Sequence, residues 1–571
     1  MSNKNIINKL ISGVLVNTMV LGISNQVFEN FKIFASSGNQ EERILGESEE
    51  RIQGDEDYYN AEELDENNID KNELKYELDG EEAKVVGFVG SEMKVVTIPS
   101  QIKKDGKVYK VTKIGDHAFC EYIKLTGVEI PDSVTEIGDY AFCDCSELTG
   151  VEIPGSVTKI GNRAFARCSG LTGELTIPGS VTYIGEYAFY ECSGLTGELT
   201  IPDSVTYIGA NAFSDCIGLT GVEIPGSVTK IGDRAFNECQ NMVIKSDIVH
   251  QDNDGLIYVL NKQDNTAELN SVLNKKLEKV DILTSVVKDD KVYKVTRISR
   301  GAFIGCSNLK GELKIPGSVK EIGADAFECC SGLTSVKISE GVEEIGRYAF
   351  YRCNKLTGEL TIPGSVTYIG DNAFEGCSGL TSVEIPGSVT KISPYVFQDC
   401  SGLTGELKIP GSVTEIGYRA FNRCSGLTGE LKIPGSVTEI GEEAFSCCSG
   451  LTGKLTIPEG VTKIGDRAFE CCSRLTGVEI PGSVTYIGAN AFYGCSELTG
   501  NLTIPGSVTE IGESAFYDCR GLIGELKIPA SVKKIGKYTF SCCSGLTKII
   551  VPEDISIGEE TFPTGVEIEK Y

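Results

Sequence analysis

The sequence predicts a solenoid, a stack of 23- or 24-residue coils built from short parallel β-strands, turns and single helical turns. Two observations carry this prediction. A unit such as "CSGLTGELTIPGSVTYIGEYAFYEC" (Cys168 to Cys192) recurs along most of the chain, and its phenylalanine returns every 23 or 24 residues. In addition, one unit cannot bury its own apolar edges, whereas stacked copies bury them against each other.

The phenylalanines divide the repeats into two blocks. We place the first block at 115–239, with six units, and the second at 299–548, with eleven. A degenerate last unit around Phe562 forms a C-terminal cap, 549–571. The indexing residues are Phe119, Phe142, Phe165, Phe189, Phe213 and Phe236, followed by Phe303, Phe327, Phe350, Phe374, Phe397, Phe421, Phe445, Phe469, Phe492, Phe516 and Phe540.

The first half of each unit predicts a strand and a turn. In "ELTIP" the apolar residues alternate with polar ones, so Leu175 and Ile177 face inward while Thr176 faces outward. Proline then ends the strand. The "IPGS" sequence that follows is typical of a type II turn. Units with "LTGVEIP" lack one residue that units with "LTGELTIP" have, and we expect this insertion to lie in a loop before the strand.

The second half of each unit predicts a second short extended piece and one helical turn. "VTYIG" directs Val181 and Ile184 inward. In "GEYAFYEC" the spacing of Ala188, Phe189 and Cys192 would bring all three to one side of a single helical turn.

Less regular segments precede both blocks. We interpret 84–114 as a starting unit and 240–298 as a second start or a hinge, because "GKVYKVTKIG" and "DKVYKVTRIS" stand directly before the two blocks. Residues 36–83 are strongly acidic, with 18 acidic and four basic residues between Gln40 and Glu82, and predict a flexible linker. A solvated linker explains them better than a cation site, because no calcium-loop pattern of ligands is present.

The first 35 residues resemble a bacterial secretory signal peptide, with Lys4 and Lys9 ahead of the apolar run "LISGVLVNTMVLGIS". We expect the mature protein to be secreted or at the cell surface, with no membrane span after signal removal. The formal net charge of −28 repels phosphate backbones and anionic lipids, so nucleic acid is not an expected partner.

The repeated unit resembles a known family. The pattern C-S-x-L-T-x-x-x-I-P-x-S-V-T-x-I-G-x-x-A-F, from about Val85 to Phe562, is similar to the BspA-like leucine-rich repeat of secreted and surface proteins of bacteria and some protists. The resemblance implies a leucine-rich-repeat solenoid in the form of a curved rod. It also implies adhesion to host matrix proteins or to other cells, without catalytic residues shared across the family.

The 22 cysteines follow the repeat. One lies three positions after the phenylalanine in 16 of the 17 units, which predicts a ladder of buried, mostly free thiols. A ladder presents one thiol per coil, so we predict no metal site and no cofactor. Cys120 with Cys143 and Cys447 with Cys471 lie off the ladder in adjacent units, and these are our candidate disulfides.

Histidine-based catalysis has few options, because His117 and His250 are the only histidines. Carboxylates are plentiful, but no unit departs from the pattern to gather a cluster of them. We therefore predict that the protein is not an enzyme.

Outward positions that differ between units supply the candidate binding residues. Tyrosine offers a large amphipathic contact area, and the strand positions before the proline form an acidic stripe in the first block and a lysine-richer one in the second. Neutral sequence variation at solvent-exposed positions is the simpler explanation of these differences between units. The candidates are Tyr183, Tyr187, Tyr190, Tyr207, Thr176 and Thr200 in the first block, and Lys314, Lys337, Lys408 and Lys432 in the second.

These observations favour an exported, non-enzymatic binding protein, such as a bacterial adhesin that engages host matrix or cell-surface proteins, including glycoproteins, through its strand faces. A structural, self-assembling surface protein is the first alternative. A secreted hydrolase with a targeting array is the second, but too few residues remain outside the repeats for a catalytic domain.

Overall fold

Short strands and turns make up the whole of the described chain. The computed structural model describes residues 74–89 and 93–571, and those residues contain no helix. It follows that none of them forms a helix able to cross a membrane. The predicted signal peptide (1–35) and residues 36–73 of the predicted linker lie outside the described ranges.

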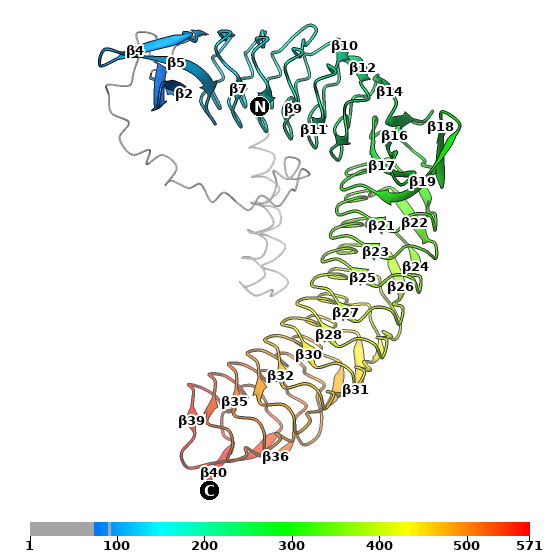
Figure 1. Cartoon of the computed structure of the whole chain (residues 1–571). Coiled ribbons are helices and arrows are strands. Elements are labelled where there is room, and N and C mark those ends of the chain that lie inside the picture. Colours follow the sequence, from blue (N-terminus) through cyan, green and yellow to red (C-terminus); the bar gives the residue numbers. More distant parts are fainter. Residues whose placement is uncertain (1–73, 90–92) are drawn as a thin grey trace, which may run out of the picture. The chain divides into compact units, whose positions relative to one another are not determined.

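The coils stack as the sequence predicts, and the solenoid prediction is confirmed (Figure 1). Each coil contributes up to two strands that pair in parallel with those of the next coil. We call the strands before the proline the long-strand row. In the first block they are β6 (Gly127–Glu129), β10 (Gly197–Thr200) and β12 (Leu219–Ile224), and β14 (Val243–Ser246) continues the row directly after the block. In the second block they are β20 (Gly311–Ile315), β22 (Leu333–Ile338), β24 (Gly358–Thr361), β26 (Leu380–Glu384), β29 (Gly429–Glu430), β31 (Leu451–Thr456), β33 (Leu475–Glu479), β36 (Gly524–Lys527), β38 (Leu546–Val551) and β40 (Glu567–Lys570).

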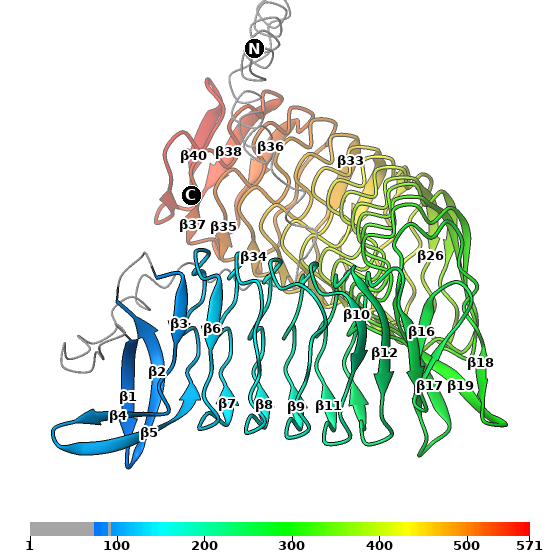
Figure 2. The same cartoon turned by 90° about the horizontal axis from the view of Figure 1, so that it is seen from above.

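The second strand of each coil, in the Val-Thr-x-Ile segment, belongs to what we call the short-strand row. Neighbouring strands of this row, such as β7 (Glu136–Ile137) and β8 (Lys159–Ile160), lie side by side (Figure 2). Their isoleucines are in register from coil to coil, as in the pairs Ile160 with Ile184 and Ile184 with Ile208. In the first block the members are β7 (Glu136–Ile137), β8 (Lys159–Ile160), β9 (Tyr183–Ile184), β11 (Tyr207–Ile208) and β13 (Lys230–Ile231). In the second block they are β21 (Glu321–Ile322), β23 (Glu344–Ile345), β25 (Tyr368–Ile369), β27 (Lys391–Ile392), β28 (Glu415–Ile416), β30 (Glu439–Ile440), β32 (Lys463–Ile464), β34 (Tyr486–Ile487), β35 (Glu510–Ile511), β37 (Lys534–Ile535) and β39 (Ser556–Ile557).

The turn between the two rows differs from the expected type. The Val181 N–H donates to the Pro178 carbonyl at 3.0 Å, so proline is the first residue of the turn. Neither Gly179 nor Ser180, the two central residues, has a positive φ. The type II prediction was therefore wrong, because that turn needs a positive φ at its third position. Ser180 also donates to the Val157 carbonyl of the preceding coil at 2.6 Å.

The phenylalanine-containing segment, which we call the arc, is not the predicted helical turn. The N–H groups of Tyr187, Phe189 and Glu191 donate to carbonyls of the next coil at 2.8, 2.8 and 2.9 Å. Tyr187 and Glu191 have φ values of 55° and 56°. These left-handed residues bend the chain at two points per coil. The intervening N–H groups of Ala188 and Tyr190 close tight turns on the Gly185 and Tyr187 carbonyls at 3.3 and 3.1 Å, so the arc combines short turns with pairing to the next coil. Apolar spacing alone cannot distinguish this bend from a helical turn.

The extra residue of the 24-residue units forms a β-bulge at the start of a long strand. Where β10 pairs with β12, the register shifts between Gly197 and Glu198, and Gly197 has a φ of 82°. Only glycine adopts this conformation without strain, so the insertion requires the glycine of "LTGELTIP". The coils on either side stay in register.

Two caps that share a four-strand arrangement open the two blocks. The first comprises β1 (Leu74–Asp79), β2 (Glu82–Phe88), β3 (Val95–Thr97), β4 (Gln101–Lys104) and β5 (Lys107–Ile114). The second comprises β15 (Val249–Gln251), β16 (Leu256–Asn261), β17 (Thr266–Val272), β18 (Ser285–Lys288) and β19 (Lys291–Ile298). The hairpin β1–β2 pairs in parallel with β5 as β16–β17 pairs with β19, and β4 and β18 add antiparallel strands.

The first cap begins earlier than predicted. Residues 74–83, which we assigned to the linker, belong to the hairpin β1–β2, and Leu74 and Tyr76 are buried. The alternation in "LKYELDGEEAKVV", broken by Asp79-Gly80, is a hairpin signal that the surrounding acidic residues obscured.

Hydrogen bonds join the second cap to the first block. The buried side chain of Asn270 accepts from the Arg234 N–H at 3.1 Å and donates to the Gly232 carbonyl at 3.1 Å. Glu238 accepts from the Lys275 N–H at 3.1 Å. Alternate residues of β16 also serve different cores, with Ile257 packed against the first block and Tyr258 against the second. Segment 240–298 therefore connects the two stacks through hydrogen bonds and through side chains packed into both cores.

The phenylalanines form the centre of both cores. Successive rings stack in parallel, for example Phe119 on Phe142 at 5.2 Å and Phe350 on Phe374 at 5.2 Å between centroids. The stack ends at Phe562, which lies 6.4 Å from Phe540 and confirms the degenerate last unit.

Candidate interaction surface

A stacked tyrosine pair lies on the short-strand row of the first block. Tyr183 in β9 and Tyr207 in β11 are directly paired residues of adjacent coils, and their rings stack at 4.9 Å with an interplanar angle of 6°. Both side chains are half-buried. Burial raises the pKa of both hydroxyl groups, so both are protonated at neutral pH and can donate hydrogen bonds.

Lysines flank this pair at the same position of the neighbouring coils. Lys230 in β13 has its Nζ 5.7 Å from the centroid of the Tyr207 ring. On the other side Lys159 in β8 pairs with Glu136 at 2.8 Å. Because each tyrosine covers one face of the other, the pair offers its ring edges and hydroxyl groups to a partner, between two exposed ammonium groups.

The other two predicted tyrosines lie elsewhere. Tyr187 and Tyr190 belong to the arc, and the two residues are 9% and 5% exposed. They pack edge to face at 5.4 Å and form a small cluster with Cys143 and Ala166, while the Arg163 guanidinium lies 4.7 Å from the Tyr187 ring. So little of each ring is exposed that the structure argues against a contact role, and we leave both out of the proposed surface. Although Tyr187 and Tyr190 are near Tyr183 and Tyr207 in the sequence, they do not lie on the same face of the coil.

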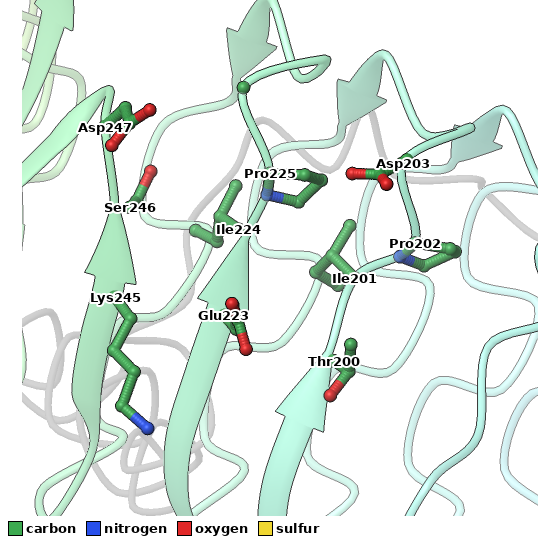
Figure 3. A pocket seen from close by; sticks show the side chains of 11 residues that line it. Thr200, Ile201, Pro202, Asp203, Glu223, Ile224, Pro225, Lys245, Ser246 and Asp247 are labelled. Carbon is green, nitrogen blue, oxygen red and sulfur yellow. The ribbon is translucent and has the colours of Figure 1, made fainter.

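Thr176 and Thr200 are exposed on the long-strand row, as predicted. Thr200, Glu223 and Lys245 are directly paired on β10, β12 and β14 and form an outward row (Figure 3). The row borders a shallow cavity of about 490 Å³, which is also lined by Asp203 and Asp247. Lys245 forms an ion pair with Glu198 at 3.2 Å. The sequence alone does not identify Lys245 as a member of this row, because its unit lacks the proline that marks the strand.

The four candidate lysines of the second block are exposed and lie in two directly paired couples. Lys314 pairs with Lys337 on β20 and β22, and Lys408 bridges to Lys432. Glutamates partly balance these charges, with Lys314 3.4 Å from Glu312 and Lys432 2.7 Å from Glu406. Like charges directly opposite each other disfavour the fold, so each couple is an energetically unfavourable pairing that an acidic partner would relieve.

The cysteine ladder has a role that the sequence analysis did not foresee. The Cys192 thiol donates to the Phe165 carbonyl of the preceding coil at 3.1 Å, and 14 other ladder cysteines make the equivalent bond. Burial raises the pKa of most of these donating thiols, for example those of Cys145 and Cys495 to about 12. They are therefore protonated hydrogen-bond donors.

All 22 cysteines are free thiols in the structure. Cys120 and Cys143 nevertheless lie close enough for each thiol to change the pKa of the other, as do Cys447 and Cys471. The two candidate disulfides thus stay predictions, and the two cysteines of each pair are neighbours.

The two histidines have different surroundings. His117 stacks on Tyr140 at 4.5 Å and lies beside the Cys120 thiol, whereas His250 belongs to β15. Within residues 74–89 and 93–571, no group of three or more histidine, cysteine or acidic side chains is placed to hold a metal ion.

Comparison with protein families identifies the repeat. The model of the BspA type leucine-rich repeat region matches in six copies over residues 112–243, 283–404, 404–523 and 463–571, more than half of the chain. The chain belongs to the BspA-type leucine-rich-repeat family. A comparison of this BspA-type chain with curated protein sequences gave no match.

Several solved structures resemble this BspA-type chain. A leucine-rich cell surface protein of Faecalibacterium prausnitzii is 29% identical, covers 67% of this chain and 93% of its own, and has a TM-score of 0.39. A leucine-rich repeat protein of Bacteroides ovatus is 24% identical with coverages of 87% and 98% and a TM-score of 0.34. One from Eubacterium ventriosum is 21% identical with coverages of 74% and 98% and a TM-score of 0.48. The family assignment of the BspA-type chain rests on the family model and not on these structures.

A second stacked tyrosine pair in the BspA-type chain escaped the sequence analysis. Tyr493 and Tyr517, each one position after a core phenylalanine in adjacent coils, stack at 5.0 Å and are half-buried. The signal was available as tyrosine at the same offset in two consecutive units.

Proposed function

We propose that the protein is a non-enzymatic adhesin, secreted or held at the bacterial cell surface, that binds host matrix or other cell-surface proteins. The observation that carries this proposal is the stacked pair of Tyr183 and Tyr207 between Lys159 and Lys230. Tyrosine is among the residues that contribute most to protein interfaces, and a rigid pair loses little side-chain entropy on binding.

The repeat scaffold supports this role. Coils fixed by inter-coil hydrogen bonds hold the two tyrosines in one orientation before a partner arrives, which reduces the entropy lost on association. Membership of a repeat family supplies binding surfaces and no shared catalytic residues.

The lysine couples of the second block form a second contact area. Lys314 with Lys337, and Lys408 with Lys432, would attract acidic stretches of the partner and raise the association rate. Their contribution should weaken as salt concentration rises, whereas that of the tyrosine pair should change little.

Binding of the full chain to immobilised fibronectin, fibrinogen, laminin and mucin tests the proposal. We expect saturable binding to at least one of them, weakened tenfold or more in the Tyr183→Ala/Tyr207→Ala variant. The matched control is Tyr368→Ala/Tyr486→Ala, which removes unstacked tyrosines at the same position of the short-strand row, and it should change affinity less than twofold.

Two results would count against this function. Equal weakening by both double variants would show that the stacked pair has no special role. A wild-type chain that binds nothing on the panel but forms concentration-dependent oligomers in sedimentation velocity would favour self-assembly instead.

A further inference from the structure

Two pairs of thiols lie side by side on adjacent coils, outside the cysteine ladder. Cys120 and Cys143 each directly follow a core phenylalanine, whereas Cys447 and Cys471 each stand two positions after one. The thiols of each pair are neighbours, because each changes the pKa of the other. Among the 22 thiols, only these four have a second thiol in such contact outside the ladder.

The coils hold each pair in place. The Glu121 N–H donates to the Cys143 carbonyl at 2.7 Å, and the Cys447 N–H donates to the Glu470 carbonyl at 2.7 Å. Adjacent hydrogen-bonded strands keep paired Cα atoms about 5 Å apart, which lies inside the range that disulfides occupy. The β-carbons need to approach by only about 1 Å, so no rearrangement of the coils is required.

We infer that Cys120 with Cys143 and Cys447 with Cys471 are two dithiol modification sites, at which a low-molecular-weight disulfide such as oxidised glutathione introduces covalent links between adjacent coils. The inference concerns the scaffold and does not depend on the proposed adhesin function.

The surroundings of the first pair assign the order of attack. The hydrogen bond with Cys143 and then that with His117 lower the pKa of the Cys120 thiol, against the opposing effects of burial and of the Glu121 charge. The same contact raises the pKa of His117. Cys120 is therefore the attacking thiolate, with the imidazolium of His117 beside it. Cys143 is buried and lies 3.1 Å from a carboxylate oxygen of Asp144.

The reaction has two steps. His117 takes the Cys120 proton, and the thiolate attacks one sulfur of the disulfide RSSR, which gives Cys120–S–S–R and RS⁻; the imidazolium then protonates RS⁻. Asp144 takes the Cys143 proton, and the Cys143 sulfur attacks the Cys120 sulfur and releases a second RS⁻, which recovers that proton. Two protein thiols are oxidised and RSSR is reduced to two RSH.

The second pair has a similar asymmetry without an imidazole. The hydrogen bond with Cys471 and then that with Ser446 lower the pKa of Cys447, against burial. Ser446 lies 3.7 Å from the Cys447 sulfur. Cys447 is thus the attacking thiol and Cys471 the second one, and the reaction should be slower than at Cys120.

One other cysteine provides an internal control. Cys329 occupies the same arc position as Cys447, but Gly305 and Arg352 stand at that position in the adjacent coils. Burial raises its pKa to about 11, so it should react slowly and form no intramolecular link.

The test uses the reduced full chain in buffers of oxidised and reduced glutathione at pH 7.5, quenched with acid and analysed by alkylation and peptide mass spectrometry. We expect two disulfides, Cys120–Cys143 and Cys447–Cys471, with ladder thiols alkylated only after denaturation. Cys143→Ser and Cys471→Ser should each abolish one link and leave the other. His117→Asn, which keeps a residue suited to the left-handed backbone at φ 56°, should slow the first link at least threefold and leave the second unchanged.

Three outcomes would overturn the inference. They are accumulation of glutathionylated Cys120 or Cys447 without the internal link, links that join ladder cysteines instead, and four thiols that stay reduced at every glutathione ratio.

Discussion

At the scale of single residues, the ladder cysteine both fills space in the core and donates a hydrogen bond to the preceding coil. It fills a fully buried position beside the phenylalanine stack, and its thiol donates to a phenylalanine carbonyl of the preceding coil, as Cys377 does to Phe350 at 3.2 Å. Alanine would fill less volume and leave that carbonyl with one partner fewer.

Replacing one ladder thiol should therefore destabilise the stack locally. We expect Cys377→Ala to lower the free energy of unfolding by about 1–3 kcal/mol, from the lost hydrogen bond and the small cavity. Urea unfolding followed by circular dichroism under reducing conditions measures the change. Cys329→Ala, at a half-buried position outside the ladder, should cost less than about 1 kcal/mol. Equal effects of the two substitutions would mean that the ladder position has no special importance.

Individual binding residues were only partly predictable from the sequence. The alternation of the short strand places Tyr183 and Tyr207 outward, and the structure has them half-exposed and stacked. Tyr187 and Tyr190 lie in the arc, where a left-handed residue turns the backbone inward. No periodic pattern in the sequence indicates this change of direction, so the burial of Tyr187 and Tyr190 could not be predicted.

At the scale of the element, close approach of successive coils decides which residues are allowed. A Cβ atom built on Gly209, in the Ile-Gly step after β11, would lie 2.4 Å from the Glu186 nitrogen and 2.4 Å from the Gly185 carbonyl carbon. Both are backbone atoms of the preceding coil and cannot move aside. Packing and not φ therefore favours glycine at this step. Serine stands there in two coils, as Ser299 and Ser393, and the Ser393 hydroxyl donates to the Ile369 carbonyl of the preceding coil.

A single methyl group at this step should strain the stack. We expect Gly209→Ala to lower the free energy of unfolding by about 3 kcal/mol or more, because the two coils must separate. Gly179→Ala is the matched control: a Cβ there meets nothing within 4 Å, and Ala530 already occupies the equivalent turn position. That control should stay within about 0.5 kcal/mol of wild type or become slightly more stable. A mild effect at Gly209 would show that the coils can adjust.

Strands were predictable because their signal is local, and the arc was not. Alternating residues such as Leu175, Thr176 and Ile177 specify which side faces the core, whichever turn follows. The arc instead depends on hydrogen bonds to the next coil, such as that from the Phe189 N–H to the Ala212 carbonyl at 2.8 Å. A partner 23 residues away leaves no trace in the spacing of Ala188, Phe189 and Cys192, which fits a helical turn equally well.

At the scale of the whole molecule, the many buried thiols link stability to pH. Burial raises the pKa of the Cys145, Cys306 and Cys495 thiols to about 12, and that of other ladder thiols is raised as well. In an unfolded chain the same thiols ionise near pH 8.5. Below that pH both states are protonated and the thiols contribute no pH dependence. Above it the unfolded chain loses protons first, so stability falls as pH rises toward the folded-state pKa.

The solenoid should therefore be labile to alkali. Each ladder thiol with a raised pKa lowers the free energy of unfolding by about 1.4 kcal/mol per pH unit between about pH 8.5 and its folded-state pKa. Cys120 and Cys447, whose pKa is lowered, act in the opposite direction, but they are two groups against fifteen ladder thiols. Urea midpoints at constant ionic strength and under reducing conditions should stay level from pH 6.5 to 8 and then drop steeply by pH 10. Cys377→Ala should reduce the pH dependence of the free energy of unfolding by the contribution of one thiol, about 1.4 kcal/mol per pH unit. A urea midpoint that does not change with pH up to 10 would contradict a protonated, buried ladder.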